Sequence, residues 1–217
     1  MTRLVTTPIY TLVEGEGDAK AVPTLLARLG RYLGVHVAWS APRRWKNIHL
    51  WEPGPGRRGG LLRGLEFMRS KREVGGVLVL RDEDDRCPRQ IAPGISTRIG
   101  NLNLPFRTAV TLLHPEYEVL FLPCMHRMQS HGFPPHTQWD GATWEARRDV
   151  KGWLSSQLPK GRSYKPTTDQ KPMTRSIDFP ELHAAQVACF GSLVRAVRFL
   201  GGGGPGGRVY PPPAELP

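Results

Sequence analysis

The sequence is short of cysteine, of long apolar runs and of acidic residues. Its three cysteines are too few and too far apart to form a disulfide framework, as is usual where thiols stay reduced. No uninterrupted apolar run approaches the roughly 18 residues of a membrane-spanning helix, so we expect a soluble protein that does not enter a membrane. Acidic residues directly follow the first short apolar stretch, and no secretory cleavage pattern is present, which favours a cytoplasmic location.

Basic residues outnumber acidic ones, and the acidic ones are clustered. The 217-residue chain carries 30 Lys and Arg against 19 Asp and Glu, a formal net charge of +11. A positive field of this kind attracts nucleic acid in general, although it identifies no reaction. One acidic group contains Glu14, Glu16 and Asp18, and a second covers residues 82–85. Clustered acids in a basic protein need a physical reason.

Apolar patterns predict alternating strands and helices over most of the chain. Residues 77–80 form a continuous apolar run, which is typical of a strand that is covered on both faces inside a parallel sheet. Asp18 stands where the N-cap of the first helix is expected. The predicted strands cover 7–13, 77–80, 108–113 and 119–122, and the predicted helices cover 18–30, 61–71, 144–158 and 190–200.

The order of these segments predicts one α/β domain over residues 1–200. Strands that alternate with helices favour a mostly parallel, Rossmann-like sheet flanked by helices. Residues 42–60, which are rich in Pro, Gly and Arg, predict a long basic loop. Residues 201–217 form a Gly- and Pro-rich tail that has almost nothing to bury, so we expect the tail to be disordered.

Both acidic groups directly follow predicted strands, and this position predicts a metal site. Ligands of open α/β sheets bind at the carboxyl ends of the strands, where Glu14 could meet Asp82 and Asp84. Packed carboxylates repel one another, and a hard divalent cation such as Mg²⁺ removes that repulsion. If the strand stays extended through residues 82–85, the alternation of its side chains places Asp82 and Asp84 on the same side.

These motifs resemble those of Toprim domains. Residues 12–18, LVEGEGD, resemble the first Toprim motif, a hydrophobic strand followed by Glu-Gly, and residues 80–85, LRDEDD, resemble the Asp-x-Asp second motif. More narrowly, the chain resembles the DUF4276 family of Toprim-like bacterial proteins. The motifs that carry this resemblance occur in the usual order, with PEYE at 115–118, YKP at 164–166 and a closing helix that contains FGSL at 190–193.

The resemblance implies a Mg²⁺- or Mn²⁺-dependent nuclease, related to OLD-type Toprim nucleases, in a bacterial defence or DNA-processing system. No position can be assigned to a topoisomerase tyrosine, and no attached helicase or zinc domain indicates a primase. The resemblance also implies DNA as substrate in preference to RNA, and an ATPase as partner protein. The implied catalytic residues are Glu14, Asp82 and Asp84, which are also metal ligands together with Asp85 and Glu118, and Asp18 is an accessory acid.

Three basic segments are candidates for binding phosphates. Trp45 and Trp51 interleave with the first of these segments, where they could stack on unpaired bases or pack in the protein. The basic segments could equally be a solvated surface, because net charge also improves solubility. The candidate nucleic-acid-binding residues are Arg43, Arg44, Lys46, Arg57, Arg58, Arg63, Lys160, Arg162 and Lys165.

Two alternatives come from other classes of protein. The first is a non-catalytic nucleic-acid-binding or effector-assembly subunit, in which the acids hold a structural cation. The second is a phosphotransferase with Asp82 and Asp84 as nucleophile and acid, as in haloacid-dehalogenase-like phosphatases. That family places its Asp-x-Asp on an early strand and before Thr or Val, whereas Asp85 follows here and a full strand–helix unit comes first.

Overall fold

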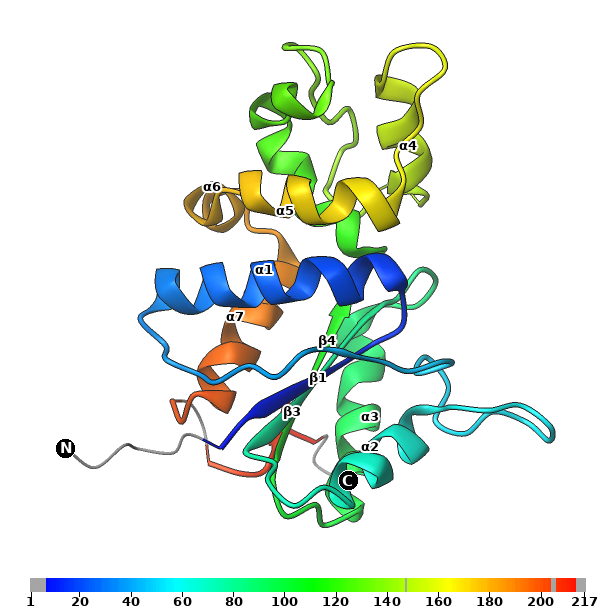
Figure 1. The fold of residues 1–217 in the computed structure, drawn as a ribbon, viewed down its shortest axis with the longest axis vertical. Helices are drawn as coiled ribbons and strands as arrows, with labels where there is room; N and C mark the ends of the chain where they lie inside the picture. The colour runs from blue at the N-terminus through cyan, green and yellow to red at the C-terminus, as the bar shows by residue number, and fades with distance from the viewer. Residues whose placement is uncertain (1–6, 147, 204–205, 214–217) are drawn as a thin grey trace.

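The computed structural model describes residues 7–146, 148–203 and 206–213, which form a parallel sheet with helices on both faces (Figure 1). The strands follow the order β2-β1-β3-β4-β5, and every neighbouring pair is parallel. The predicted α/β class with a parallel sheet is therefore confirmed. The strands are β1 (Ile9–Val13), β2 (Arg43–Arg44), β3 (Gly76–Asp82), β4 (Arg107–Leu113) and β5 (Val209–Tyr210).

The side chains of the central strands alternate between two hydrophobic cores, one on each face of the sheet. Leu78 and Leu80 of β3 enter the larger core, whereas Val77 and Val79 enter the smaller one. The same alternation directs Asp82 toward the face of the larger core. The larger core is covered by α1 (Glu16–Leu33) and α7 (Ala188–Leu200), and the smaller core by α2 (Leu61–Arg69) and α3 (Pro88–Asn101).

A further layer of short helices lies between β4 and α7 in sequence and is stacked above α1 in Figure 1. Trp153, Leu154 and Met173 of this layer are buried in the larger core, and α1 contacts both η3 and α5. The layer therefore extends the larger core beyond the sheet. Its elements are η1 (Tyr117–Arg127), η2 (Gln129–His131), α4 (Val150–Gln157), η3 (Pro166–Gln170), α5 (Lys171–Ser176) and α6 (Phe179–Ala184).

The strand predicted at residues 119–122 is wrong, because this segment belongs to the 3-10 helix η1. All four of its side chains are buried in the larger core. A short run that is apolar at every position fits a buried helix as well as a buried strand, since it has no periodicity that separates the two. The helix predicted over 144–158 is shorter in the structure, where Asp149 caps the N-terminus of α4 through a bond from the backbone N–H of Gly152.

The disordered tail predicted at 201–217 is also corrected by the structure. Val209 and Tyr210 form β5, which adds a parallel strand to the edge of β4. Tyr210 is buried, and its hydroxyl accepts a hydrogen bond of 2.8 Å from Nε of Arg195 on α7. Strand pairing and burial thus order a segment whose composition alone indicates disorder. Residues 204–205 and 214–217 of the predicted tail lie outside the described residues.

The first helix begins earlier than predicted. Gly15 is its N-cap, and Asp18 lies in its first turn, where Oδ2 of Asp18 accepts a bond of 3.1 Å from the backbone N–H of Gly15. Within the described ranges, no helix combines the length and the apolar character needed to cross a membrane.

Candidate metal centre

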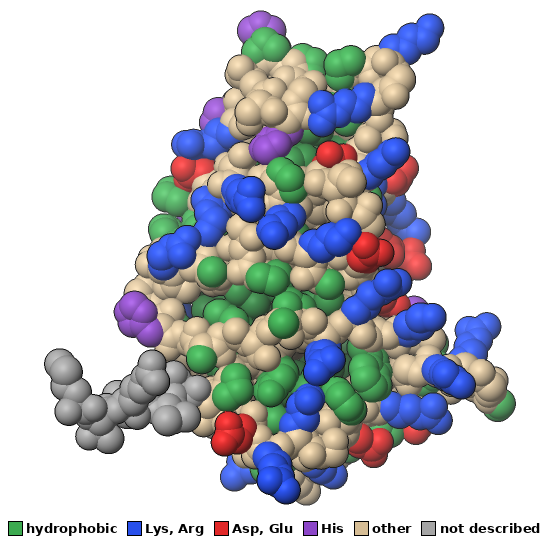
Figure 2. All heavy atoms as spheres, viewed as in Figure 1, with side chains coloured by type: hydrophobic (Ala, Val, Ile, Leu, Met, Phe, Trp, Pro, Cys, Tyr) green, Lys and Arg blue, Asp and Glu red, His purple; other side chains and the backbone are tan. Residues whose placement is uncertain are grey.

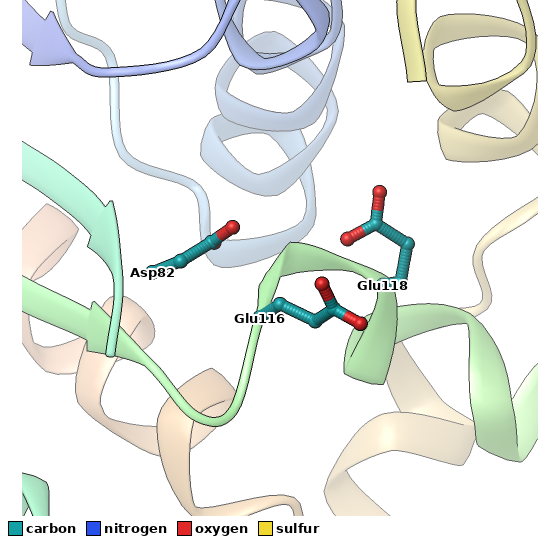
Figure 3. A group of neighbouring side chains, drawn as sticks. All are labelled: Asp82, Glu116 and Glu118. Carbon is teal, nitrogen blue, oxygen red and sulfur yellow. The ribbon is translucent and has the colours of Figure 1, made fainter. Parts of the chain in front are cut away.

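Three acidic side chains converge at the carboxyl edge of the sheet (Figure 3). Asp82 is the last residue of β3, and the parallel register places it opposite Leu113, the last residue of β4. The chain that leaves β4 therefore passes beside the end of β3, and it carries Glu116 and Glu118 into the start of η1. The three side chains each offer one carboxylate oxygen, and these oxygens lie within 4.8 Å of one another.

Asp82 is held by the backbone of the neighbouring segment. Its Oδ1 accepts a hydrogen bond of 2.9 Å from the N–H of Tyr117, which joins the end of β3 to the start of η1. Burial raises the pKa of Asp82 well above its ordinary value, and the charges of Asp18, Glu118 and Glu116 raise it further, whereas Lys151 opposes them. The carboxyl group is thus oriented in advance, but its negative charge is costly without a cation.

Glu118 is fully buried, and its two oxygens differ in their partners. Oε1 accepts a hydrogen bond of 2.8 Å from the hydroxyl of Tyr164. Oε2 has no hydrogen-bond donor among the residues that the structure describes. Burial raises the pKa of Glu118 to about 7, against the opposing effects of Lys151 and Tyr164. Glu118 therefore offers a desolvated oxygen that would gain from a cation.

Lys151 of α4 places a single ammonium group among the three carboxylates. Its Nζ lies 2.5 Å from Oε2 of Glu116, 3.3 Å from Oδ2 of Asp82 and 3.5 Å from Oε2 of Glu118. Its backbone N–H also donates a bond of 2.8 Å to Oε1 of Glu116. Burial would lower the pKa of Lys151, but the three carboxylates outweigh it and raise this pKa. One positive charge still leaves the cluster with excess negative charge when all three acids are ionised.

Asp82, Glu116 and Glu118 could hold a metal ion, and their chemistry fits a hard one. All three offer carboxylate oxygens, the donors that Mg²⁺, Mn²⁺ and Ca²⁺ prefer over soft sulfur ligands. Oε2 of Glu118, which no donor of the described residues reaches, is an independent sign that the group is incomplete as it stands.

The other predicted ligands lie outside this group. Glu14 follows β1, is about one-third exposed, and has Oε1 2.9 Å from Nδ1 of His49. Asp84 and Asp85 are exposed beyond the end of β3, and Asp85 pairs with Arg148. Because the strand ends at Asp82, the expected alignment of Asp82 with Asp84 along an extended strand does not form. In the described part of the chain, none of these acids belongs to a set of three potential ligands.

Asp18 and Glu83 are held by other parts of the structure. Besides its bond from Gly15, Asp18 accepts a bond of 2.8 Å from Nε2 of Gln170, which ties α1 to η3. Glu83 lies between the guanidinium groups of Arg81 and Arg86. Although burial opposes them, the bonds from both arginines lower the pKa of Glu83, so this acid is neutralised within the protein.

Sequence reasoning did not include Lys151 or Glu116 in the site. The spacing Glu116-x-Glu118 directly after a predicted strand is a signal that could have added Glu116. Lys151 lies 69 positions from Asp82, and no local pattern links the two. The packing of α4 against η1 brings its side chain to the acids.

All nine predicted nucleic-acid-binding residues are exposed. Arg43 and Arg44 form the edge strand β2, and Nε of Arg44 donates to the backbone oxygen of Glu14 at 3.3 Å. Figure 2 shows Lys and Arg side chains spread over the visible face, with several on the segment that projects at the lower right, between β2 and α2. Basic groups therefore lie on β2, the edge strand that adjoins β1. In the view of Figure 2, the basic side chains do not form one continuous band.

The two tryptophans of the basic loop have packing partners inside the protein. The indole N–H of Trp45 donates to the backbone oxygen of Gly60 at 3.0 Å, and its ring stacks on Phe67 with centroids 5.3 Å apart. The ring of Trp51 lies under the guanidinium of Arg98. Both side chains also pack against the smaller core. These contacts favour packing over base stacking.

Comparison of the chain with protein-family models, with curated proteins and with solved structures finds no match. The fold and the site therefore define the class by themselves. The chain is an α/β protein with a parallel five-stranded sheet, and it carries a cluster of three carboxylates and one lysine at the carboxyl edge of that sheet.

Proposed function

We propose that the chain is a hydrolase of nucleic-acid phosphodiesters that uses Mg²⁺ or Mn²⁺ bound by Asp82, Glu116 and Glu118. The observation that carries this proposal is the group of three converging carboxylates at the carboxyl edge of the sheet, in which one buried oxygen of Glu118 has no donor among the described residues. In open α/β sheets, ligands bind at the carboxyl ends of the strands, where this group lies. The net charge of +11 supports a polyanionic substrate.

The residues around the carboxylates prepare the site for a cation. The N–H of Tyr117 orients Asp82, and the hydroxyl of Tyr164 orients Glu118, so two ligands are fixed before a cation binds. A bound divalent cation would neutralise phosphate charge and lower the pKa of a bound water. The exposed basic side chains of β2 and of the loop after it would hold the phosphate backbone.

The remaining predicted roles extend this proposal. Glu14 follows β1, the strand beside β3, and would act from the flank of the centre as an acid or base. Asp84 and Asp85 would contribute carboxylate ligands from the exposed segment after β3, and Asp18 would be an accessory acid. The resemblance to Toprim-like proteins supports DNA as substrate, an ATPase partner, and a role in bacterial defence or DNA processing.

Incubation of the purified protein with plasmid DNA, single-stranded DNA or RNA tests the proposal. We expect cleavage with Mg²⁺ or Mn²⁺ and none with EDTA. Asp82→Asn and Glu118→Gln should each slow cleavage by at least about a hundredfold, because each removes a charged ligand. Glu66→Gln is a matched control, since Glu66 is exposed on α2 at the opposite face of the sheet. Unchanged metal-dependent cleavage by the Asp82 variant would refute the proposed site.

The contacts of Lys151 favour one alternative, a nucleic-acid-binding subunit without catalysis. Its ammonium partly neutralises the acids, so the only role of the cluster could be to stabilise the helical layer. Salt-sensitive binding of nucleic acid without turnover under any of these metals would support that alternative.

A further inference from the structure

The ammonium of Lys151 occupies the centre of the carboxylate group. Its Nζ lies within 3.5 Å of one oxygen from each of Asp82, Glu116 and Glu118. A bound Mg²⁺ would need oxygens from the same side chains at about 2.0–2.1 Å. An ammonium and a divalent cation cannot both take this position, because their ligand shells would overlap.

We propose that Lys151 and the divalent cation exchange at this centre. Lys151 fills it in the metal-free protein, and its side chain leaves when the cation enters. This inference rests on the metal centre of the proposed function, and it assigns to Lys151 a role as the resident counter-charge that sets the affinity for the metal.

The attachment of Lys151 allows the exchange without movement of α4. Its backbone N–H donates to Oε1 of Glu116, so the start of the helix stays tied to the site when the side chain moves. The side chain is 36% exposed, which leaves a path to solvent for the ammonium. Its stem of four carbons is flexible enough to follow that path.

The contacts of Glu118 show what the ammonium leaves incomplete. Oε2 of Glu118 is buried and has no hydrogen-bond donor in the described residues, and the distance of 3.5 Å to Nζ of Lys151 is too long for a hydrogen bond. Lys151 therefore satisfies Glu116 well and Glu118 poorly. A divalent cation brings twice the charge to the same oxygens and would also satisfy Glu118.

Titration with Mn²⁺ by calorimetry tests the exchange, with Lys151→Met and the matched control Lys171→Met. Lys171 is an exposed lysine at the start of α5 and is not one of the predicted nucleic-acid-binding residues. We expect Lys151→Met to bind Mn²⁺ at least about tenfold more tightly than the wild type, because the competing charge is gone. Lys171→Met should bind like the wild type. Equal or weaker binding by folded Lys151→Met overturns the exchange.

A measurement on the wild-type protein keeps the test valid if Lys151→Met does not fold. Lysine acetylation by a mild reagent, followed by mass spectrometry, reports how accessible each ammonium is. Saturating Mg²⁺ should speed acetylation of Lys151 by at least about threefold relative to Lys171, because the displaced side chain is released to solvent. An unchanged ratio overturns the exchange.

The outcomes separate this inference from the proposed function. Suppose that the wild type binds Mn²⁺ and that Glu118→Gln weakens this binding. If Lys151→Met then binds Mn²⁺ no more tightly, and Mg²⁺ does not speed acetylation of Lys151, only the exchange fails. If neither the wild type nor Lys151→Met binds Mn²⁺, the metal centre itself is refuted, and the exchange falls with it.

Discussion

The hydroxyl of Tyr164 donates a hydrogen bond of 2.8 Å to Oε1 of Glu118, across 46 positions of sequence and in the interior of the protein. Burial raises the pKa of Glu118 to about 7, and the bond from Tyr164 acts in the opposite direction. Tyr164 therefore stabilises the charged form of Glu118, whereas burial favours its neutral form. This bond makes Glu118 available as an anionic ligand near neutral pH.

Tyr164→Phe should destabilise the protein and weaken metal binding. The substitution leaves Oε1 of Glu118 buried without its donor, which costs about 1–3 kcal/mol of unfolding free energy. The loss should be larger above neutral pH, where Glu118 is charged, than near pH 5 (about two units below its folded pKa). Urea unfolding above neutral pH and near pH 5 measures the loss of unfolding free energy at each pH. Tyr32→Phe is the control, because the Tyr32 hydroxyl bonds His183 at an exposed position. An equal loss in both variants would contradict the assigned role of Tyr164.

The raised pKa of Glu118 predicts how stability depends on pH without metal. The folded protein keeps the Glu118 proton up to about pH 7, whereas the unfolded chain releases it near the ordinary value of 4.5. The folded state thus binds more protons in this window, and the stability that Glu118 contributes is lost as pH rises from about 4.5 to about 7.

Glu118→Gln isolates this contribution, because glutamine has no proton to release in this range. In EDTA, the unfolding free energy of the wild type should fall relative to that of Glu118→Gln by on the order of 2–3 kcal/mol between about pH 5 and pH 8. Glu66→Gln should keep the wild-type slope. A wild-type curve parallel to that of Glu118→Gln would show that Glu118 titrates in the usual range. Saturating Mn²⁺ should reverse the trend, since the metal needs the ionised carboxylate.

The sheet could be predicted from the sequence because its signals are local. The apolar runs of β3 and β4 are buried on both faces, and the acids that follow β3 mark its carboxyl end. Asp82 was found in this way, and the resemblance added Glu118. The extent of β3 was not predictable in the same way, because residues 82–85 are acidic throughout, and pairing with β4 decides where the strand ends.

The rest of the site depends on contacts that no local pattern encodes. The position of Lys151 requires that α4 fold back on η1, and the sequence predicts a strand at residues 119–122 within η1. Likewise, Tyr164 belongs to the YKP motif of a basic, Pro-containing segment, but nothing in that motif predicts the contact of Tyr164 with Glu118. The sequence thus predicted the edge of the sheet that carries the site, while tertiary packing decides which side chains complete it.

Lys151→Met should be unstable without metal and recover with it. In EDTA at about pH 8, the three acids lose their shared counter-charge, which we expect to cost about 2 kcal/mol of unfolding free energy. This is less than for a fully buried pair, since Lys151 is 36% exposed. Saturating Mn²⁺ should restore most of the loss, whereas Lys171→Met should lose little in either condition. Thermal or urea unfolding measures the effect, and no recovery with Mn²⁺ would argue against a metal at these carboxylates.

Arg43 tests whether the basic edge strand binds phosphates. Arg43→Gln should weaken binding of a fluorescent single-stranded oligonucleotide in EDTA, and the slope of log Kd against log salt should fall by about 0.7 for one lost phosphate contact. Arg198→Gln is the matched control, because Arg198 is an exposed arginine of α7, outside the predicted basic segments. If both variants reduce the slope equally, the attraction comes from net charge rather than from β2. If only Arg43→Gln does, the nucleic acid crosses the edge strand that adjoins β1, and its backbone would pass close to Glu14.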